Sequence, residues 1–289
     1  DKGGTVMRGQ STSHGAATIV SAFANGKGAA FGIDLTTSAE VRLEEGEGVS
    51  VLIDGFPGES TALAENCVRA VLERCVPDRD LHARVITRSA IPVSRGLKSS
   101  SAAANAIIFA TLDALGQEVD EIEAIRLGTK AAMAAGVSLT GAFDDACAAW
   151  FGGVVLTDNR SETILARDIM PDHLKVLIHV PDFQIRKGAL PRERIAAMRD
   201  LVDLAFQQAQ GGNYYRALTL NGMCYSTALG LDQEVALKAL QNGALAAGLT
   251  GSGPATVMLV EEDKVSEFVH SMDDYTLMTA NIYNGRSKT

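Results

Sequence analysis

The sequence predicts an α+β fold. Strand-like and helix-like segments are mixed along both halves of the chain. The 289 residues suffice for two modest domains that each bury a core, and a content of 46% hydrophobic and 21% charged residues is typical of globular proteins. We therefore expect two domains built from mixed or antiparallel sheets packed by helices.

The first half of the chain alternates strands with helices. Apolar or alternating stretches bounded by glycine predict strands at residues 17–23, 29–44, 49–54, 82–90 and 153–157. Helical spacing, alanine-rich composition and acidic starts predict helices at residues 61–75, 99–115, 120–135 and 141–153. The helix over 99–115 is mostly apolar, so we expect it to be buried on several sides.

The second half repeats this mixture. Strands are predicted at residues 174–180, 255–260 and 275–283, and helices at residues 192–208, 214–229, 234–247 and 265–272. The turn composition T-D-N-R at residues 157–160 predicts a boundary between domains at 7–157 and 158–289. Residues 1–6 precede Met7 and are left out of this prediction.

Charge and apolar content exclude several classes of partner. The formal net charge of −9 provides no overall basic surface to hold nucleic acid. No apolar run is long enough to span a bilayer. Scattered cysteines among apolar neighbours predict buried thiols and a cytoplasmic protein. A homodimer is compatible with the sequence.

A short loop followed by a helix carries the clearest sign of chemistry. Residues 92–102 read P-V-S-R-G-L-K-S-S-S-A, so one proline and one glycine precede a lysine and three serines. The first amides of a helix have no partner within the helix, and its dipole adds positive charge there. Such a loop is suited to hold phosphates, with serine hydroxyls reaching phosphate or magnesium, although Ser99 alone fits an ordinary helix cap.

Two further glycine clusters accompany this loop. One is A-N-G-K-G-A-A-F-G-I-D at residues 24–34, and the other is L-T-G-S-G-P-A-T-V-M-L at residues 249–259. No Walker loop and no complete dinucleotide fingerprint is found. The three segments, in this order, resemble the P-x-x-x-G-L-x-S-S-A, A-P-G-K and C-terminal glycine-rich motifs of the GHMP kinases. The sequence is therefore identified as a member of that family.

Within the family, the chain is most similar to the archaeal-type shikimate kinases. The segments that carry this likeness are G-K-G-A-A-F-G-I-D-L, G-L-K-S-S-S-A-A-A-N-A and T-G-A-F-D-D-A-C-A-A-W-F-G-G. Lys98 and Ser101 stand where many relatives have glycine and alanine. The resemblance implies a nucleotide site between two domains, with ATP and Mg²⁺, and transfer of phosphate to the 3-hydroxyl of shikimate.

The resemblance also implies roles for individual residues. Two adjacent acids beside an apolar run are costly unless they meet a metal or donors, and relatives place a catalytic aspartate in this segment. Asp145 is predicted slightly ahead of Asp144 as the base, with Asp144 and Ser100 toward Mg²⁺ and Lys27 as a catalytic lysine, although acids also favour any helix start. The residues predicted to bind the nucleotide are Pro92, Val93, Ser94, Arg95, Gly96, Leu97, Lys98, Ser99, Ser100, Ser101, Ala102, Gly251, Ser252 and Gly253.

Some features depart from the family pattern. G-I-D at residues 32–34 replaces the G-E-H of several relatives, which argues against galactose or mevalonate as substrate. The helix before the aspartates lacks the glutamate that several relatives use for Mg²⁺, so the Asp pair is expected to take over. The shikimate carboxylate requires a cation, for which the candidates are Arg95, Arg186, Lys187, Arg192 and Arg194.

Two alternatives remain open. The segment at residues 24–35 also loosely resembles the corresponding loop of homoserine kinases, which implies homoserine as the acceptor. A metabolite sensor without catalysis would keep the fold, but such a protein is expected to lose the aspartates or the serine loop, and both are present.

Overall fold

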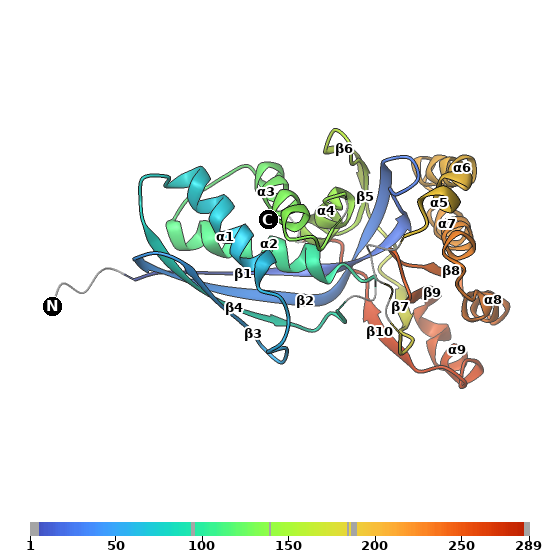
Figure 1. Cartoon of the computed structure of the whole chain (residues 1–289). Coiled ribbons are helices and arrows are strands. Elements are labelled where there is room, and N and C mark those ends of the chain that lie inside the picture. The colour runs from blue at the N-terminus through green and yellow to red at the C-terminus, as the bar shows by residue number, and fades with distance from the viewer. Residues whose placement is uncertain (1–5, 94–95, 139, 184, 186–189, 286–289) are drawn as a thin grey trace.

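The computed structural model describes residues 6–93, 96–138, 140–183, 185 and 190–285. It consists of one mixed and one antiparallel sheet with helices packed on them (Figure 1). The predicted α+β class is therefore confirmed.

The first sheet contains six strands. They are β1 (Met7–Val20), β2 (Lys27–Glu45), β3 (Val49–Ile53), β4 (Leu81–Ser89), β5 (Val154–Asp158) and β6 (Thr163–Asp168). One edge of β2 pairs with β1, while the other pairs with β5 through residues 27–31 and with β4 through residues 37–45. β3 runs parallel to β4, and β6 lies antiparallel to β5.

Four helices cover one face of this sheet (Figure 1). They are α1 (Ala62–Cys75), α2 (Ser99–Leu115), α3 (Glu121–Ala134) and α4 (Phe143–Phe151). The alanine-rich α2 lies in the middle and approaches β1 closely: a Cβ added at Gly9 would lie 2.2 Å from the carbonyl oxygen of Ala110. Small side chains on both elements allow this approach, which brings the start of α2 over the sheet.

The second sheet has four antiparallel strands in the order β10-β7-β9-β8. They are β7 (Leu174–His179), β8 (Ala246–Leu249), β9 (Thr256–Glu261) and β10 (Leu277–Asn281). One face packs on α5 (Arg192–Ala197), α6 (Arg199–Gln210) and α7 (Tyr214–Leu229), and the other on α8 (Glu234–Gln241) and α9 (Val265–Ser271), which follows the 3₁₀ turn η2 (Glu262–Lys264). Among the described residues, no helix has both the length and the apolar character needed to cross a membrane.

The two sheets share one hydrophobic core. Phe31 of β2 and Val257 of β9 belong to the same buried cluster. Asp34 also ties the sheets together, because its carboxylate accepts hydrogen bonds from the backbone and side-chain nitrogens of Asn281, each at 2.7 Å. The predicted boundary at 157/158 falls before the last residue of β5, and β6 pairs back onto that strand; this boundary stays a prediction.

The strands β1 and β6 differ from the sequence prediction. β1 begins at Met7, ten residues before the predicted 17–23, and ends at Val20. Its first half lacks apolar alternation because buried positions that face α2 hold the small residues Gly9 and Ser13, which allow this helix to approach. β6 was not predicted, since most of its residues are exposed at the sheet edge and leave no alternating pattern.

Two predicted helices were wrong in extent. The helix expected over 192–208 is interrupted at Met198, which ends α5 and precedes α6. The helix expected over 234–247 ends at Gln241, because Gly243 adopts a φ of 97° and turns the chain into β8. The A-A-G-L sequence of β8 favours a helix locally, so its strand conformation depends on pairing with β9.

Candidate active site

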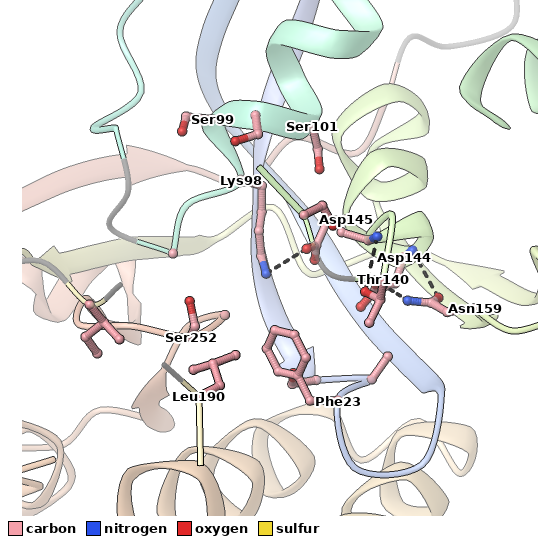
Figure 2. A pocket seen from close by; sticks show the side chains of 18 residues that line it. Phe23, Lys98, Ser99, Ser101, Thr140, Asp144, Asp145, Asn159, Leu190 and Ser252 are labelled. Atoms are coloured by element: carbon pink, nitrogen blue, oxygen red, sulfur yellow. Dashed lines mark hydrogen bonds and ion pairs between the residues drawn. The ribbon is translucent and has the colours of Figure 1, made fainter. Parts of the chain in front are cut away.

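A cavity lies where four segments of the chain meet (Figure 2). The starts of α2 and α4 supply two of its walls, and the turn after β1 and the loop after β8 supply others. The predicted residues that line it are Gly96, Lys98, Ser99, Ser100, Ser101, Asp144, Asp145, Gly251 and Ser252. The structure thus brings the serine loop, the aspartate pair and the C-terminal glycine loop to one place, whereas the segment at residues 24–34 does not line the cavity.

The remaining predicted nucleotide residues lie around this cavity. Leu97 and Ala102 are buried in the hydrophobic core and hold the loop to it. Val93 lines an adjoining cavity, whereas Pro92 and Gly253 line neither. Ser94 and Arg95 lie outside the described residues.

The start of α2 is open toward the cavity. Lys98 precedes the helix in the left-handed region, with φ 65° and ψ 33°, and its side chain makes no capping hydrogen bond to the first amides. Ser99 is thus the first residue of the helix and not its cap. Three serines and the first amides of the helix on one cavity wall form an environment for an anion.

The glycine loop after β8 supports the phosphate loop from behind. The Thr250 hydroxyl donates to the carbonyl oxygen of Gly96 at 2.9 Å, and the amide of Gly251 donates to the Thr18 hydroxyl at 2.9 Å. Gly96 has φ 89°, and a Cβ there would lie 2.1 Å from the Thr250 carbonyl oxygen. Glycine is therefore required for the two loops to approach each other.

Lys98 and Asp145 form an ion pair inside the cavity. The Lys98 Nζ lies 2.9 Å from Oδ2 of Asp145, and the two side chains are 10% and 11% exposed. Oδ1 of Asp145 is buried and has no hydrogen-bond partner among the described residues. Because an unpaired buried carboxylate oxygen is costly, this atom indicates a position for a ligand donor or cation.

The carboxylate of Asp144 is held by Asn159. The Asn159 Nδ2 donates to Oδ1 of Asp144 at 2.8 Å, while Asn159 Oδ1 accepts from the Asp144 amide and from the Thr157 hydroxyl. These two donors define which way the Asn159 amide points. Burial, followed by the negative charge of Asp145, raises the pKa of Asp144 to about 7.

Lys27 lies away from the two aspartates. A Cβ added at Gly28 would lie 2.3 Å from Oδ2 of Asp144, so that face of β2 looks toward the cavity. Neighbouring residues of a strand point to opposite faces, and the exposed Lys27 places its ammonium 5.8 Å from the centre of the Phe206 ring. Lys98 is the lysine paired with Asp145, and Lys27, which was predicted as a catalytic lysine, does not line the cavity.

The predicted carboxylate-binding cations do not reach the cavity within the described residues. Arg192 and Arg194 are exposed, and Arg194 donates to the carbonyl oxygen of Thr227 at 2.8 Å. Arg95, Arg186 and Lys187 lie outside the described residues.

The sequence analysis missed several lining residues. They are Ser21, Ala22, Phe23, Ser138, Thr140, Ala142, Asn159, Ile185 and Leu190. Asn159 had a signal in the sequence, because an asparagine directly after a strand and close to the Asp pair is well placed to bind it. The others belong to turns and loops whose position depends on the tertiary fold.

Comparison with known proteins assigns the chain to a family. The GHMP kinases N terminal domain matches residues 62–153, and the GHMP kinases C terminal domain matches residues 196–275. The shikimate kinase of Methanothrix thermoacetophila is 48% identical over 256 residues, which cover 89% of this chain and 86% of that protein. The chain belongs to the GHMP kinase family.

Other relatives agree with this assignment. The shikimate kinase of Halobacterium salinarum is 41% identical over 264 residues, covering 90% of this chain and 91% of that protein. Among solved structures, Lactococcus lactis galactokinase matches with a TM-score of 0.77 at 16% identity, covering 98% of this chain and 95% of the galactokinase. Homoserine kinase from Cytophaga hutchinsonii matches with a TM-score of 0.75 at 16% identity, covering 99% and 97%. The matched structures demonstrate the GHMP kinase fold.

A second cavity of about 380 Å³ adjoins the first in this GHMP kinase. Its walls are mainly apolar, with Leu63 of α1, Val93 of the phosphate loop and Ile107 of α2 among them. Ser99, Ser100 and Ile185 line both cavities. An apolar cavity next to an anion site is suited to the base of a nucleotide.

The oxygen atoms at the site fit a magnesium ion. Mg²⁺ is usually held by one or two carboxylates together with substrate phosphates and water. Ser100 and Asp144 provide such oxygens at one cavity. Among the described residues, no cluster of three or more His, Cys, Asp or Glu side chains that could hold a metal ion is found.

Proposed function

We propose that this protein is a shikimate kinase, which transfers the γ-phosphoryl group of ATP to the 3-hydroxyl of shikimate. The observation that carries the proposal is the buried Asp145, whose Oδ1 has no partner among the described residues and which lines the same cavity as the start of α2. The archaeal relatives, 40–48% identical over about nine-tenths of the chain, support shikimate as the acceptor.

On the donor side, the triphosphate binds at the start of α2. The amides of Ser99–Ser101 and the dipole of α2 neutralise part of its charge. The adenine enters the apolar cavity between α1 and α2. Ser100 and Asp144 would hold Mg²⁺, which supplies positive charge to the phosphate oxygens.

On the acceptor side, Asp145 acts as the base. Its Oδ1 accepts the proton of the 3-hydroxyl, while Lys98 holds Oδ2 and orients the carboxylate. The alcohol oxygen forms a bond with the γ-phosphorus, the bond from that phosphorus to the oxygen bridging the β-phosphate breaks, and ADP leaves. Positioning and charge neutralisation are the main demands of phosphoryl transfer on a protein.

The remaining lining residues suit a hydroxylated ring. Thr140 and Ser21 offer hydroxyl groups, whereas Phe23 and Leu190 offer apolar surface on the side away from Ser99 and Ser101 of α2 (Figure 2). Such a mixture fits a cyclic polyol with one apolar face. The predicted homodimer and cytoplasmic location stay predictions.

The test is an acceptor assay. The purified protein, ATP and Mg²⁺ are incubated in parallel with shikimate, homoserine, mevalonate and galactose, and ADP release is followed together with the mass of the phosphorylated product. We expect shikimate 3-phosphate and little product from the other alcohols. Turnover of homoserine without shikimate would replace the acceptor, and ATP binding without any transfer would favour the sensor.

A further inference from the structure

One wall of the acceptor side is a turn without regular structure. Ser21, Ala22 and Phe23 follow β1 and line the cavity. In Figure 2, Phe23 lies on the far side of the Lys98–Asp145 pair from Ser99 and Ser101. A buried turn outside a sheet or helix must find partners for its backbone groups elsewhere.

Helices of the second half of the chain provide those partners. The Ser21 amide donates to Oδ1 of Asn221 at 2.9 Å. The Tyr225 hydroxyl donates to the Ser21 carbonyl oxygen and accepts from the Ala24 amide, both at 3.0 Å. The Arg199 Nε donates to the Ala24 carbonyl oxygen at 3.2 Å. Side chains of α6 and α7 thus engage both backbone groups at each end of the turn.

The two anchors on α7 are fixed in place. Asn221 and Tyr225 are each 1% exposed. Burial raises the pKa of Tyr225 to about 12, so its hydroxyl keeps the proton that it donates. α7 itself lies directly on β8, because a Cβ added at Gly222 would be 2.5 Å from Cα of Gly248. The strand under α7 leads into the glycine loop behind the phosphate site.

We propose that Asn221 and Tyr225 are positioning residues for the phosphate acceptor. They hold residues 21–24 in place, and this turn in turn keeps the bound acceptor at the correct distance from Asp145. This inference rests on the proposed kinase function of the cavity. Neither side chain lines the cavity, so each acts through the backbone of the turn. Loss of an anchor should therefore weaken acceptor binding and leave ATP binding intact.

The test variant is Tyr225→Phe, which removes one hydroxyl and keeps the ring. We expect the KM for shikimate to rise about 10-fold, because the wall that contacts the acceptor shifts and binds it less well; a misplacement of about 1 Å can cost about 100-fold. The KM for ATP should stay unchanged. The Ala24 amide, which loses its acceptor, should exchange its hydrogen faster with deuterated solvent. Asn221→Ala is a second variant, which removes the partner of the Ser21 amide.

The matched control is Tyr214→Phe. That hydroxyl donates to Oδ2 of Asp168 at 2.6 Å, outside the cavity, so its loss should change neither KM. Unchanged KM values in folded Tyr225→Phe and Asn221→Ala would overturn the proposal, as would a parallel rise of both KM values together with a lower melting temperature. If the wild type does not phosphorylate shikimate, the proposed function fails. In that case the KM values of the wild type and the variants are compared for the alcohol that the protein does phosphorylate. This comparison, together with the exchange rate of the Ala24 amide, then decides whether Asn221 and Tyr225 hold the turn.

Discussion

The ion pair between Lys98 and Asp145 joins the starts of two helices. Lys98 precedes α2 with a φ of 65°, and Ala142, three residues before Asp145, precedes α4 with a φ of 51°. Residues other than glycine cost about 1–2 kcal/mol in this left-handed region. Both helix starts are thus held in an unfavourable backbone conformation where they meet, which indicates that the surrounding structure compensates for it.

The first prediction concerns the charge of Lys98. Lys98→Met should lower kcat by about 100-fold, because Asp145 loses the partner that orients it. It should also lower the free energy of unfolding by about 3–5 kcal/mol, the usual loss when one member of a buried ion pair is removed. Steady-state kinetics and urea unfolding measure both.

A conservative variant separates orientation of the base from phosphate binding. Lys98→Arg keeps the charge and should recover part of kcat. If Lys98 serves mainly to bind the triphosphate, Lys98→Met would instead raise the KM for ATP and leave kcat nearly intact, which would contradict the role proposed here.

The two aspartates should respond differently to neutralisation. Asp145→Asn should reduce kcat by about 10²–10⁴-fold, the usual contribution of a positioned base, with little change in the KM for ATP. Asp144→Asn should reduce kcat less and raise the Mg²⁺ concentration required for half-maximal rate. The side-chain oxygen of the new asparagine can still accept from Asn159, so the local fold is kept. The opposite ranking of kcat values would exchange the two roles.

Much of the fold could be predicted because local and tertiary signals agree. The helix at 99–115 was predicted to the residue: its sequence is small and apolar, and Gly116 ends it with a φ of 62°. The strand β8 could not be predicted, because its A-A-G-L sequence becomes a strand only through pairing with β9. Sequence patterns therefore identify the elements whose own composition determines their secondary structure, but not those that depend on tertiary pairing.

The motifs that form the site were predicted from the sequence, but the contacts between their residues were not. The serines and both aspartates were named from their neighbours in the chain, and the structure brings them together. The prediction of Lys27 as a catalytic lysine was wrong because the opposite face of β2 is turned toward the cavity, and no local pattern shows this. Asn221 and Tyr225 lie about 200 residues from the turn that they hold, as the separations of 200 and 201 residues show.

A further prediction concerns stability and pH. The pKa of Asp144 is raised by burial from 3.8 to about 7, so the folded protein binds this proton at pH values where the unfolded chain has released it. The free energy of unfolding should therefore fall as pH rises through this window, by up to about 1.4 kcal/mol per pH unit. Asp144→Asn removes the titratable carboxyl group, so the free energy of unfolding of this variant should depend less on pH. Urea unfolding at several pH values between about 4 and 7, without Mg²⁺ or nucleotide, measures this dependence. Equal slopes for the wild type and the variant would contradict the prediction.

The contact between the two glycine loops can be tested by adding a single methyl group. In Gly96→Ala the new Cβ would lie 2.1 Å from the Thr250 carbonyl oxygen at a φ of 89°, so the loops must separate. We expect the free energy of unfolding to fall by about 1–3 kcal/mol because of backbone strain. The KM for ATP should rise because the phosphate loop moves. Gly58→Ala is the matched control, since no atom lies within 4 Å of its added Cβ. Wild-type stability and KM for ATP in Gly96→Ala would show that the C-terminal loop does not support the phosphate site, because a methyl group cannot occupy the place of a carbonyl oxygen.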